Sequence, residues 1–462
     1  MERSGRRGEQ EGLFASMATA LTRGDLPTRL SFVLMGSGCF LRRQIGRGLL
    51  YLAAEAAFFL YFFGFGWNYL RQFPTLGTEV QRRVFDEEAG IYRITAGDNS
   101  MEILLFSVVT LLLTVLFLRL WAGNIRTAWQ AQQLKAEGQR LPTFREDFRS
   151  LADSRYHISL LTLPTLLVVV FTVLPLIFMV LIALTNFDKA HQPPGNLFTW
   201  VGLQNFRDLF SGSGQKSATF FRLFGWTLIW ATFATFLNYL LGMVVALMIN
   251  KHSIRLKSTW RTLFVIPIAV PQFVTLLLMS QLLSSEGTGG GINVLLQELG
   301  WISAPVNFLT DGFMAKITVI VVNIWIGIPY TILITSGILM NIPEDIYESA
   351  RIDGAGPART FFSITLPYML FVTTPYLITQ FVGNFNNFNV IYLLTGGGPL
   401  SLDYYQAGKT DLLVTWLYKQ TVNQQNYNLA STIGIIVFVV SAGLSLLVYN
   451  SSASSKKEEQ FQ

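Results

Sequence analysis

Long apolar stretches dominate the pattern of hydrophobic and polar positions along this chain. Eight stretches of about 20 residues or more contain almost no charged side chains, and each can cross a hydrocarbon core about 30 Å thick as a helix. In lipid, only a helix satisfies its own backbone polar groups over such a length. We therefore expect an all-α, polytopic membrane protein with eight transmembrane helices, at residues 48–70, 101–123, 158–185, 223–249, 263–283, 317–340, 366–394 and 429–449.

Basic residues between these stretches predict the orientation. The segments 1–47, 124–157, 250–262, 341–365 and 450–462 together contain 22 Lys and Arg, and the intervening segments contain 11 over nearly the same length. Because basic residues favour the cytoplasmic side, we expect both termini in the cytoplasm of a cell-membrane protein. The first 47 residues show no apolar segment typical of a cleavable signal peptide. Residues 450–462, rich in Ser, Lys and Glu, are expected to form a disordered tail.

Composition excludes several classes of function. Charged residues make up 13% of the chain, about half the share usual in soluble domains. The net charge of +6 comes from residues flanking apolar stretches, which argues against a nucleic-acid partner and for membrane lipid as the surroundings. The single cysteine, Cys39, excludes an internal disulfide, and the three histidines are scattered. We therefore expect no metal, no cofactor and no catalytic residues.

Two charged residues lie inside apolar stretches. Such a residue is by default a candidate functional site. Here Arg119 can extend to the cytoplasmic interface, and Glu55 can pair with a neighbouring helix. No series of buried acids or histidines is present, which disfavours an ion-coupled secondary carrier.

The segment 341–367 predicts two short helices joined by a turn. Pro343 can open the first helix, with Glu344 and Asp345 at its positive end. The residues from Asp353 to Pro357 break it. Ile346, Tyr347 and Ala350 fall on one face beside Glu348, which suits docking into a groove on a partner; the alternative is an ordinary amphipathic linker.

The same segment resembles the signature loop of ABC-importer permeases. That loop reads Glu-Ala-Ala, Asp-Gly-Ala and Ile-x-Leu-Pro, and this chain has Glu348-Ser349-Ala350, Asp353-Gly354-Ala355 and Ile364-Thr365-Leu366-Pro367. Residues 322–339, 380–388, 394–399 and 407–414 resemble the MalF-type permease subunit of maltose/maltodextrin importers, of the binding-protein-dependent transport system inner membrane component family. The resemblance covers 158–449, and the two extra N-terminal spans of that family match the first two here. It implies a type I importer permease fold, with an ATPase-coupling helix at Tyr347, Glu348, Ser349, Ala350, Asp353, Gly354 and Ala355.

This resemblance suggests a domain organisation. Residues 1–47 form a cytoplasmic segment, 48–157 two additional helices and a linker, 158–449 a six-helix permease domain with coupling loop 341–367, and 450–462 the tail. MalF proteins of Gram-negative type have a large external domain after the third span, whereas residues 188–222 here are a short loop. The chain is therefore more similar to Gram-positive-type relatives.

Polar residues recur within three of the expected spans. Tyr376, Gln380, Asn384 and Asn387 share one helical face, as do Asn323, Gly327 and Tyr330, and Pro267 and Pro271 next to Gln272 suggest a broken helix. Amides bind sugar hydroxyls, but they also join membrane helices, and the pattern fits either role. The resemblance implies sugar contacts at Asn323, Ile326, Gly327, Tyr330, Asn384 and Asn387, with Gln380 on the same face. Three contact positions differ: Ile268 replaces a tyrosine, Gln272 a serine and Gly383 a phenylalanine. The loss of two aromatic residues implies a wider and less apolar pocket, with room for a longer or different sugar than maltose.

The resemblance also implies partners. They are a second, MalG-like permease subunit, two ATP-binding-cassette ATPase subunits, an extracellular sugar-binding protein and an oligosaccharide moved by alternating access. Gly408-Lys409-Thr410 ends like a phosphate-binding loop, but Asp403 occupies the position of its first glycine. We therefore expect no ATP hydrolysis by this chain and no enzymatic activity. The alternatives are a permease for another sugar class and an ion-coupled secondary carrier.

Overall fold

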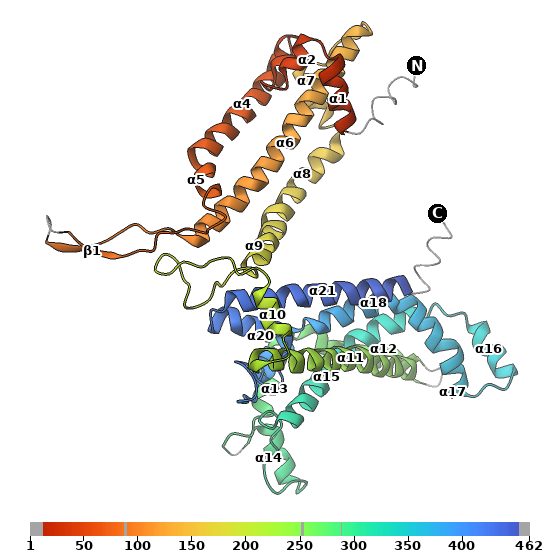
Figure 1. The fold of residues 1–462 in the computed structure, drawn as a ribbon. Coiled ribbons are helices and arrows are strands. Elements are labelled where there is room, and N and C mark those ends of the chain that lie inside the picture. Colours follow the sequence, from red (N-terminus) through yellow and green to blue (C-terminus); the bar gives the residue numbers. More distant parts are fainter. Residues whose placement is uncertain (1–12, 87–89, 251–253, 288, 452–462) are drawn as a thin grey trace. The chain divides into compact units, whose positions relative to one another are not determined.

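The computed structural model describes residues 13–86, 90–250, 254–287 and 289–451, in two compact units that divide after Val201 (Figure 1). Within these ranges, seven helices are long and apolar enough to cross a membrane, or eight if a pair bent by 86° is counted as one span. The eight-helix, all-α prediction is thus confirmed. The expected tail lies, from residue 452 on, outside the described residues. The seven are Ile45–Leu70, Ser100–Ala136, Tyr156–Ile182, Gly214–Asn250, Gly312–Leu339, Pro357–Thr395 and Tyr427–Asn450, and the bent pair is Lys257–Ala269 with Gln272–Leu282.

The N-terminal unit contains the first three spans. The sequence places the start of the permease domain at 158, whereas the compact units divide after Val201, so the third span groups with the N-terminal spans. Its elements are α1 (Leu13–Arg23), α2 (Leu26–Leu30), α3 (Ser37–Phe40), α4 (Ile45–Tyr61), η1 (Phe62–Gly66), α5 (Trp67–Leu70), β1 (Arg83–Asp86), β2 (Ile91–Ile94), α6 (Ser100–Ala136), α7 (Phe144–Ser150), α8 (Tyr156–Val168), η2 (Val169–Val173) and α9 (Leu174–Ile182).

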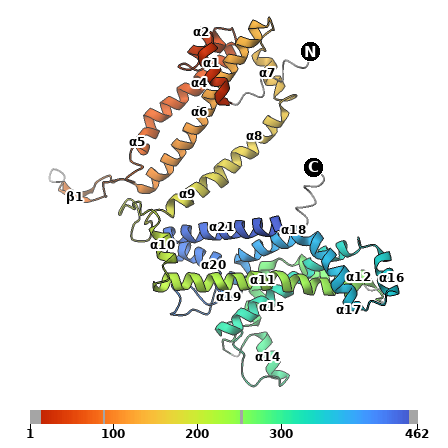
Figure 2. The same cartoon turned by 45° about the vertical axis from the view of Figure 1, so that its right-hand side comes forward.

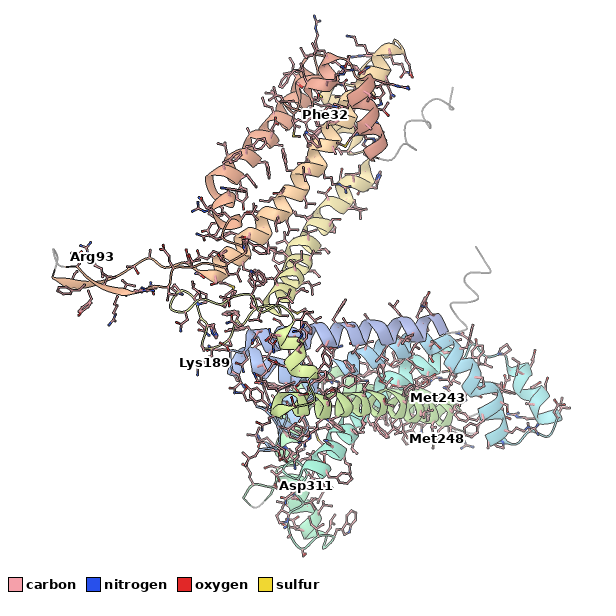
Figure 3. All side chains as sticks on the ribbon, viewed as in Figure 1. Phe32, Arg93, Lys189, Met243, Met248 and Asp311 are labelled. Carbon is pink, nitrogen blue, oxygen red and sulfur yellow. The ribbon has the colours of Figure 1, made fainter. Side chains whose placement is uncertain are left out.

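A small β-hairpin lies in the loop before α6 and was not predicted. Strands β1 and β2 pair antiparallel, with Val84 opposite Arg93 and Phe85 opposite Tyr92. Arg93, labelled in Figure 3, forms an ion pair of 2.8 Å with Asp86. The valine, phenylalanine and tyrosine are typical of strands, but the segment is too short and charged to stand out in an apolar pattern.

The segment between α2 and α3 is held by polar side chains of the first two spans. Glu55 on α4 is buried and accepts a hydrogen bond of 2.8 Å from the backbone N–H of Met35. Asn124 on α6 accepts from Gly36 N–H and donates to the carbonyl of Ser31, both at 3.0 Å. The partner of Glu55 is therefore a backbone N–H in the segment between α2 and α3, and not a side chain of a neighbouring helix as expected. Arg119 is exposed on α6.

The C-terminal unit contains the remaining spans. Helices α11, α15 and α18 contact one another, and α18 also contacts α21 (Figure 2). Figure 3 labels two residues of α11 with opposite environments: Met243 is fully buried, whereas Met248 is exposed. The elements are α10 (Gln204–Phe210), α11 (Gly214–Asn250), α12 (Lys257–Val265), η3 (Ile266–Ala269), α13 (Gln272–Leu282), α14 (Gly291–Glu298), α15 (Gly312–Leu339), α16 (Glu344–Ile352), α17 (Pro357–Thr360), η4 (Phe361–Thr365), α18 (Leu366–Phe385), α19 (Phe388–Thr395), α20 (Leu413–Tyr418), η5 (Lys419–Asn423) and α21 (Tyr427–Ser451).

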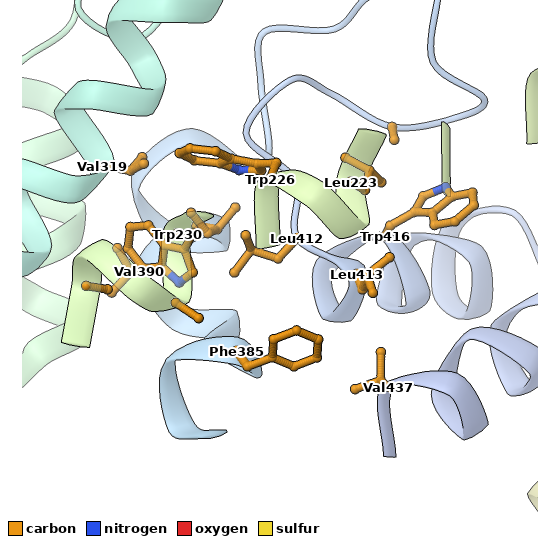
Figure 4. Packing of buried hydrophobic residues seen from close by; sticks show 14 of the residues in the cluster. Leu223, Trp226, Trp230, Val319, Phe385, Val390, Leu412, Leu413, Trp416 and Val437 are labelled. Carbon is orange, nitrogen blue, oxygen red and sulfur yellow. The ribbon is translucent and has the colours of Figure 1, made fainter. Parts of the chain in front are cut away.

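Three tryptophans anchor the main apolar cluster of this unit (Figure 4). Trp226, Trp230 and Trp416 are buried, and each indole N–H reaches a backbone carbonyl. The acceptors are Thr410 at 3.1 Å, Asn384 at 2.9 Å and Tyr405 at 3.0 Å, respectively. Because a buried tryptophan needs a partner for its N–H, the bonds of Trp226 and Trp416 fix the loop after α19 against α11 and α20, and the bond of Trp230 joins α11 to α18.

Two of the expected spans are interrupted. The fifth bends by 86° between η3 and α13, where Pro271 precedes the first residue of α13, so the expected break at the prolines is confirmed. In the seventh, α18 ends at Phe385 and α19 begins at Phe388. Asn387 caps the new helix by accepting a 3.1 Å bond from Val390 N–H. Breaks of this kind within a membrane helix occur where the freed backbone is buried or lines a cavity.

Candidate functional site

A cavity of about 370 Å³ lies within the C-terminal unit, between α11, α15 and α18. On α11 the cavity is lined by Ala234, Thr235, Asn238 and Tyr239. Ala234 belongs to the main cluster around Trp230, and Tyr239 belongs to a second apolar cluster that contains Met243. The lining of the cavity is rich in amides and hydroxyls, and none of the lining residues carries a charge. They are Ala234, Thr235, Asn238, Tyr239, Gln272, Asn323, Ile326, Gly327, Tyr330, Thr331, Ile334, Tyr376, Leu377, Gln380, Gly383, Asn384 and Asn387.

Nearly all of the sugar-site residues expected from the sequence line this cavity. Helix α15 contributes four of them, α18 three, the start of α13 one, and the turn before α19 one. Ile268 is the exception. It lies on η3 and lines a separate hollow with Arg261 and Thr262, because the 86° bend turns η3 away from α13.

The five cavity amides that were expected from the sequence fall into two groups. Asn384 donates a 3.0 Å hydrogen bond to the Thr235 hydroxyl, and Asn387 caps α19. The side-chain amides of Gln272, Asn323 and Gln380, by contrast, make no hydrogen bond to any described residue. The side chains of the first group bond to the protein itself as well as lining the cavity, whereas the polar atoms of the second group are free for a ligand.

Sequence reasoning missed the wall formed by α11. Thr235, Asn238 and Tyr239 line the cavity, and Tyr239 also forms a 2.7 Å hydrogen bond with Thr373 of α18. The signal was present, since these residues and Gly242 recur at spacings of three and four along an otherwise apolar span.

The segment expected to couple to an ATPase forms the two short helices α16 and α17. Pro343 caps α16, and Glu344 and Asp345 lie in its first turn. The helix ends in a Schellman motif: Ala355 N–H bonds to the carbonyl of Ala350 at 2.9 Å and Gly354 N–H to that of Arg351 at 3.0 Å. The φ of Gly354 is +73°, a left-handed value that glycine adopts readily, which gives the Asp-Gly-Ala sequence a physical reason.

The outward face of α16 differs from the expected one. Ala350 is buried, and Tyr347 is half-buried with its hydroxyl 3.1 Å from that of Thr365. Both side chains therefore attach α16 to its own unit. Ile346 and Ile352 are the exposed apolar residues, and Glu348, Ser349 and Asp353 are exposed as well.

A bundle of membrane helices around an uncharged polar cavity is the arrangement expected of a permease. The family model for the binding-protein-dependent transport system inner membrane component matches residues 238–454. The galactooligosaccharides transport system permease protein GanP of Bacillus subtilis is 34% identical over 92% of this chain and 97% of its own length. The maltodextrin permease MdxF of the same organism is 33% identical over 95% and 98%. This chain therefore belongs to the binding-protein-dependent transport system inner membrane component family, and it is a multi-pass protein of the cell membrane.

Two further comparisons define the extent of the likeness. The maltose/maltodextrin permease MalF of Escherichia coli is 36% identical over 57% of this chain but only 51% of its own length, in keeping with the short loop after the third span. The crystal structure of a bacterial ABC transporter involved in the import of the acidic polysaccharide alginate shares the fold. Its TM-score is 0.53 at 23% identity, and the match covers 66% of this chain and 96% of that chain.

Proposed function

We propose that this chain is the MalF-like permease subunit of an ATP-driven importer, and that neutral oligosaccharides of the maltodextrin type pass through the cavity between α11, α15 and α18. The observation that carries the proposal is the lining of that cavity, with free amides at Gln272, Asn323 and Gln380 and no charge. Sugars are neutral and polyhydroxylated, so amides suit them as both donors and acceptors. The volume is also within the usual range for small-molecule sites.

The uncharged lining separates neutral from acidic sugars. A carboxylate moved from water into a membrane-embedded cavity needs a cation or several strong donors as compensation. The solved relative belongs to a transporter of the acidic polysaccharide alginate. Among the described residues, no basic side chain lines this cavity, which supports a neutral sugar. Among neutral sugars, the relatives named for maltodextrin and for galactooligosaccharides are similar to this chain to nearly the same degree.

The partners follow from the coupling segment and the family. We place α16 in a cleft of one of two ATP-binding-cassette ATPase subunits, with Ile346, Glu348 and Ile352 as its exposed contacts. A second, MalG-like permease completes the channel, and an extracellular sugar-binding protein delivers the substrate. A complex of the alginate transporter with its sugar-loaded periplasmic protein supports that last partner. Both termini then lie in the cytoplasm, and ATP hydrolysis belongs to the ATPase subunits.

Uptake by the reconstituted transporter tests this function. Proteoliposomes containing the complete complex and the binding protein are assayed with a panel of maltodextrins, galactooligosaccharides and uronic-acid oligomers. Asn323→Ala and Gln380→Ala should each raise the KM for the transported sugar about two- to tenfold, because one hydrogen bond contributes about 0.5–1.5 kcal/mol.

Asn386→Ala is the matched control. Asn386 lies outside the cavity and donates at 3.1 Å to the Val382 carbonyl and at 3.4 Å to the Ser441 hydroxyl. Its loss should leave the KM unchanged. The proposed pathway is wrong if the assembled Asn323 and Gln380 variants transport with the KM of the parent protein.

A further inference from the structure

The amide of Asn238 lies in an unusual environment on the α11 wall of the cavity. Its side-chain oxygen is buried and has no hydrogen-bond partner among the described residues. An amide left in this state costs about 1–3 kcal/mol in a protein interior. An apolar residue could occupy the same position in this apolar span without that cost. Packing alone therefore does not explain why an asparagine is present at position 238.

The position of this amide is set by a glycine on the opposite helix. Gly327 of α15 faces Asn238, and a Cβ on Gly327 would collide with the side-chain nitrogen and carbon of the amide. One turn further along both helices, the glycine is on α11 and the larger residue is on α15. There, a Cβ on Gly242 of α11 would lie 2.5 Å from the side chain of Thr331 on α15. The two helices therefore approach closely at alternating glycines, as membrane helices commonly do. The glycine at 327 leaves the space that Asn238 occupies.

This arrangement gives Gly327 a role other than the one that the family resemblance implies. A glycine has no side chain with which to bind a sugar hydroxyl. Asn323, one turn before Gly327 on α15, lines the same cavity, and its side-chain amide has no hydrogen-bond partner among the described residues. Asn238 and Asn323 thus place two unpartnered amides on neighbouring walls, and rotation about the last side-chain torsion lets each present an oxygen or a nitrogen.

We propose that Asn238 is a sugar-binding and specificity-determining residue, and that Gly327 acts by leaving room for its amide. The inference rests on the proposed function, since it assigns a third wall to the same cavity. The ligand is a hydroxyl pair of a neutral oligosaccharide, bound between the amides of α11 and α15. An apolar or charged residue at position 238 would alter which sugars the permease accepts.

The test uses the reconstituted transporter and the sugar identified with the parent protein. Asn238→Ala should raise the KM about two- to tenfold, the effect of one lost hydrogen bond. Gly327→Ala should raise it at least as much, because the added methyl displaces the amide. The double variant Asn238→Ala/Gly327→Ala should be no worse than Asn238→Ala alone, since the group that collides with the methyl has been removed.

Each outcome separates this inference from the proposed function. An unchanged KM for Asn238→Ala, with a raised KM for Asn323→Ala, overturns the role of Asn238 and leaves the cavity as the sugar pathway. Unchanged KM values for Asn238→Ala, Asn323→Ala and Gln380→Ala together overturn the pathway itself. Additive effects of the two alanine substitutions refute the claim that Gly327 acts through Asn238.

A structural role of Asn238 predicts a different pattern. The melting temperature of the purified complex would fall while the KM stayed constant, as expected for the control Asn386→Ala. Asn238→Ser serves as the second variant if the alanine protein does not assemble. It keeps a hydroxyl in a smaller side chain, and it too should shift the KM.

Discussion

The side-chain amide of Asn384 on α18 donates a hydrogen bond of 3.0 Å to the hydroxyl of Thr235 on α11, beside the cavity that both residues line. The same asparagine accepts the indole N–H of Trp230 at its backbone carbonyl. Sugar binding and helix association, which the sequence leaves as alternatives, therefore meet in one residue. The side-chain amide of nearby Gln380 lines the cavity and has no hydrogen-bond partner within the described part of the chain.

Because Asn384 bonds to another helix and Gln380 does not, we expect the alanine variants of these two residues to differ in stability. Asn384→Ala should lower the stability of the complex by about 0.6 kcal/mol, the average for hydrogen bonds between membrane helices, and by no more than about 1.7 kcal/mol; it should also impair transport. Gln380→Ala should impair transport at the stability of the parent protein. Thermal unfolding of the detergent-purified complex, measured beside uptake, checks both. Equal losses of stability in the two variants would contradict the division into two groups of amides.

Gly383 lies on the cavity wall with open space where a side chain would project. Gly383→Phe should therefore fold normally and place an aromatic ring in the cavity, narrowing it. We expect the preference to move toward shorter glucosides, measured as the ratio of kcat/KM for disaccharide and longer substrates. Gly383→Ala is the control, with a methyl too small to narrow the cavity. An unaltered ratio in the phenylalanine variant would show that the substrate does not pass this wall.

The coupling segment offers two substitutions with distinct physical causes. Glu348→Lys reverses an exposed charge on α16 and should abolish sugar-stimulated ATP hydrolysis by weakening the docking of the ATPase. Gly354→Pro cannot adopt the φ of +73° and removes the N–H that closes the Schellman motif, so α16 loses its ending. Co-purification with the ATPase subunits and membrane abundance are measured together. Normal uptake by either variant would place the ATPase contact elsewhere.

Asp411 and Lys419 form a buried ion pair of 2.6 Å near the end of the loop that follows α19. Burial raises the pKa of the Asp411 carboxyl above its usual value, and the charge of Lys419 offsets this only in part. The folded chain therefore holds this proton more tightly than the unfolded chain does. Considered alone, this carboxyl makes the folded state more stable as the pH falls through its raised pKa, because the folded protein then binds the proton more tightly than the unfolded chain. At neutral pH the folded protein contains a buried carboxylate, which lowers its stability.

We predict that Lys419→Met destabilises the protein by about 3–5 kcal/mol at neutral pH, because it leaves that carboxylate unpaired. Adding Asp411→Asn to the same protein should restore most of the loss, since no buried charge then remains. Melting temperatures of the single and double variants check the coupling. A double variant as unstable as the single one would mean that the pair contributes by its shape and not by its charges.

The orientation can be tested residue by residue. In a Cys39→Ser background, single cysteine substitutions are introduced one at a time. Cysteines that replace Lys135 or Lys257 should be protected from an impermeant thiol reagent in intact cells. Cysteines that replace Asp98, Asp311 or Lys409 should react with it. Asp311, labelled in Figure 3, caps α15 and accepts from Phe313 and Met314 N–H. Reaction at position 257 in intact cells would reverse the predicted topology.

The sequence by itself determines the number and approximate position of the membrane spans. The requirement is one of length and composition, because any segment of about 20 apolar residues must form a helix in lipid whatever its neighbours are. Local chemistry likewise predicts where helices break or begin, as at Pro271 and at the cap of α16. The Asp353-Gly354 turn is also local, since its left-handed backbone depends on a glycine and not on a distant contact.

Only the tertiary structure decided which polar side chains share a cavity. Asn238 joins it and Ile268 does not, although the sequence analysis selected the second and passed over the first. The rotation of each helix about its axis, the 86° bend at α13 and the close approach of α11 to α15 at Gly327 set these outcomes. They depend on packing between segments far apart in the chain, where spacing along one helix carries no information about the face that a second helix presents.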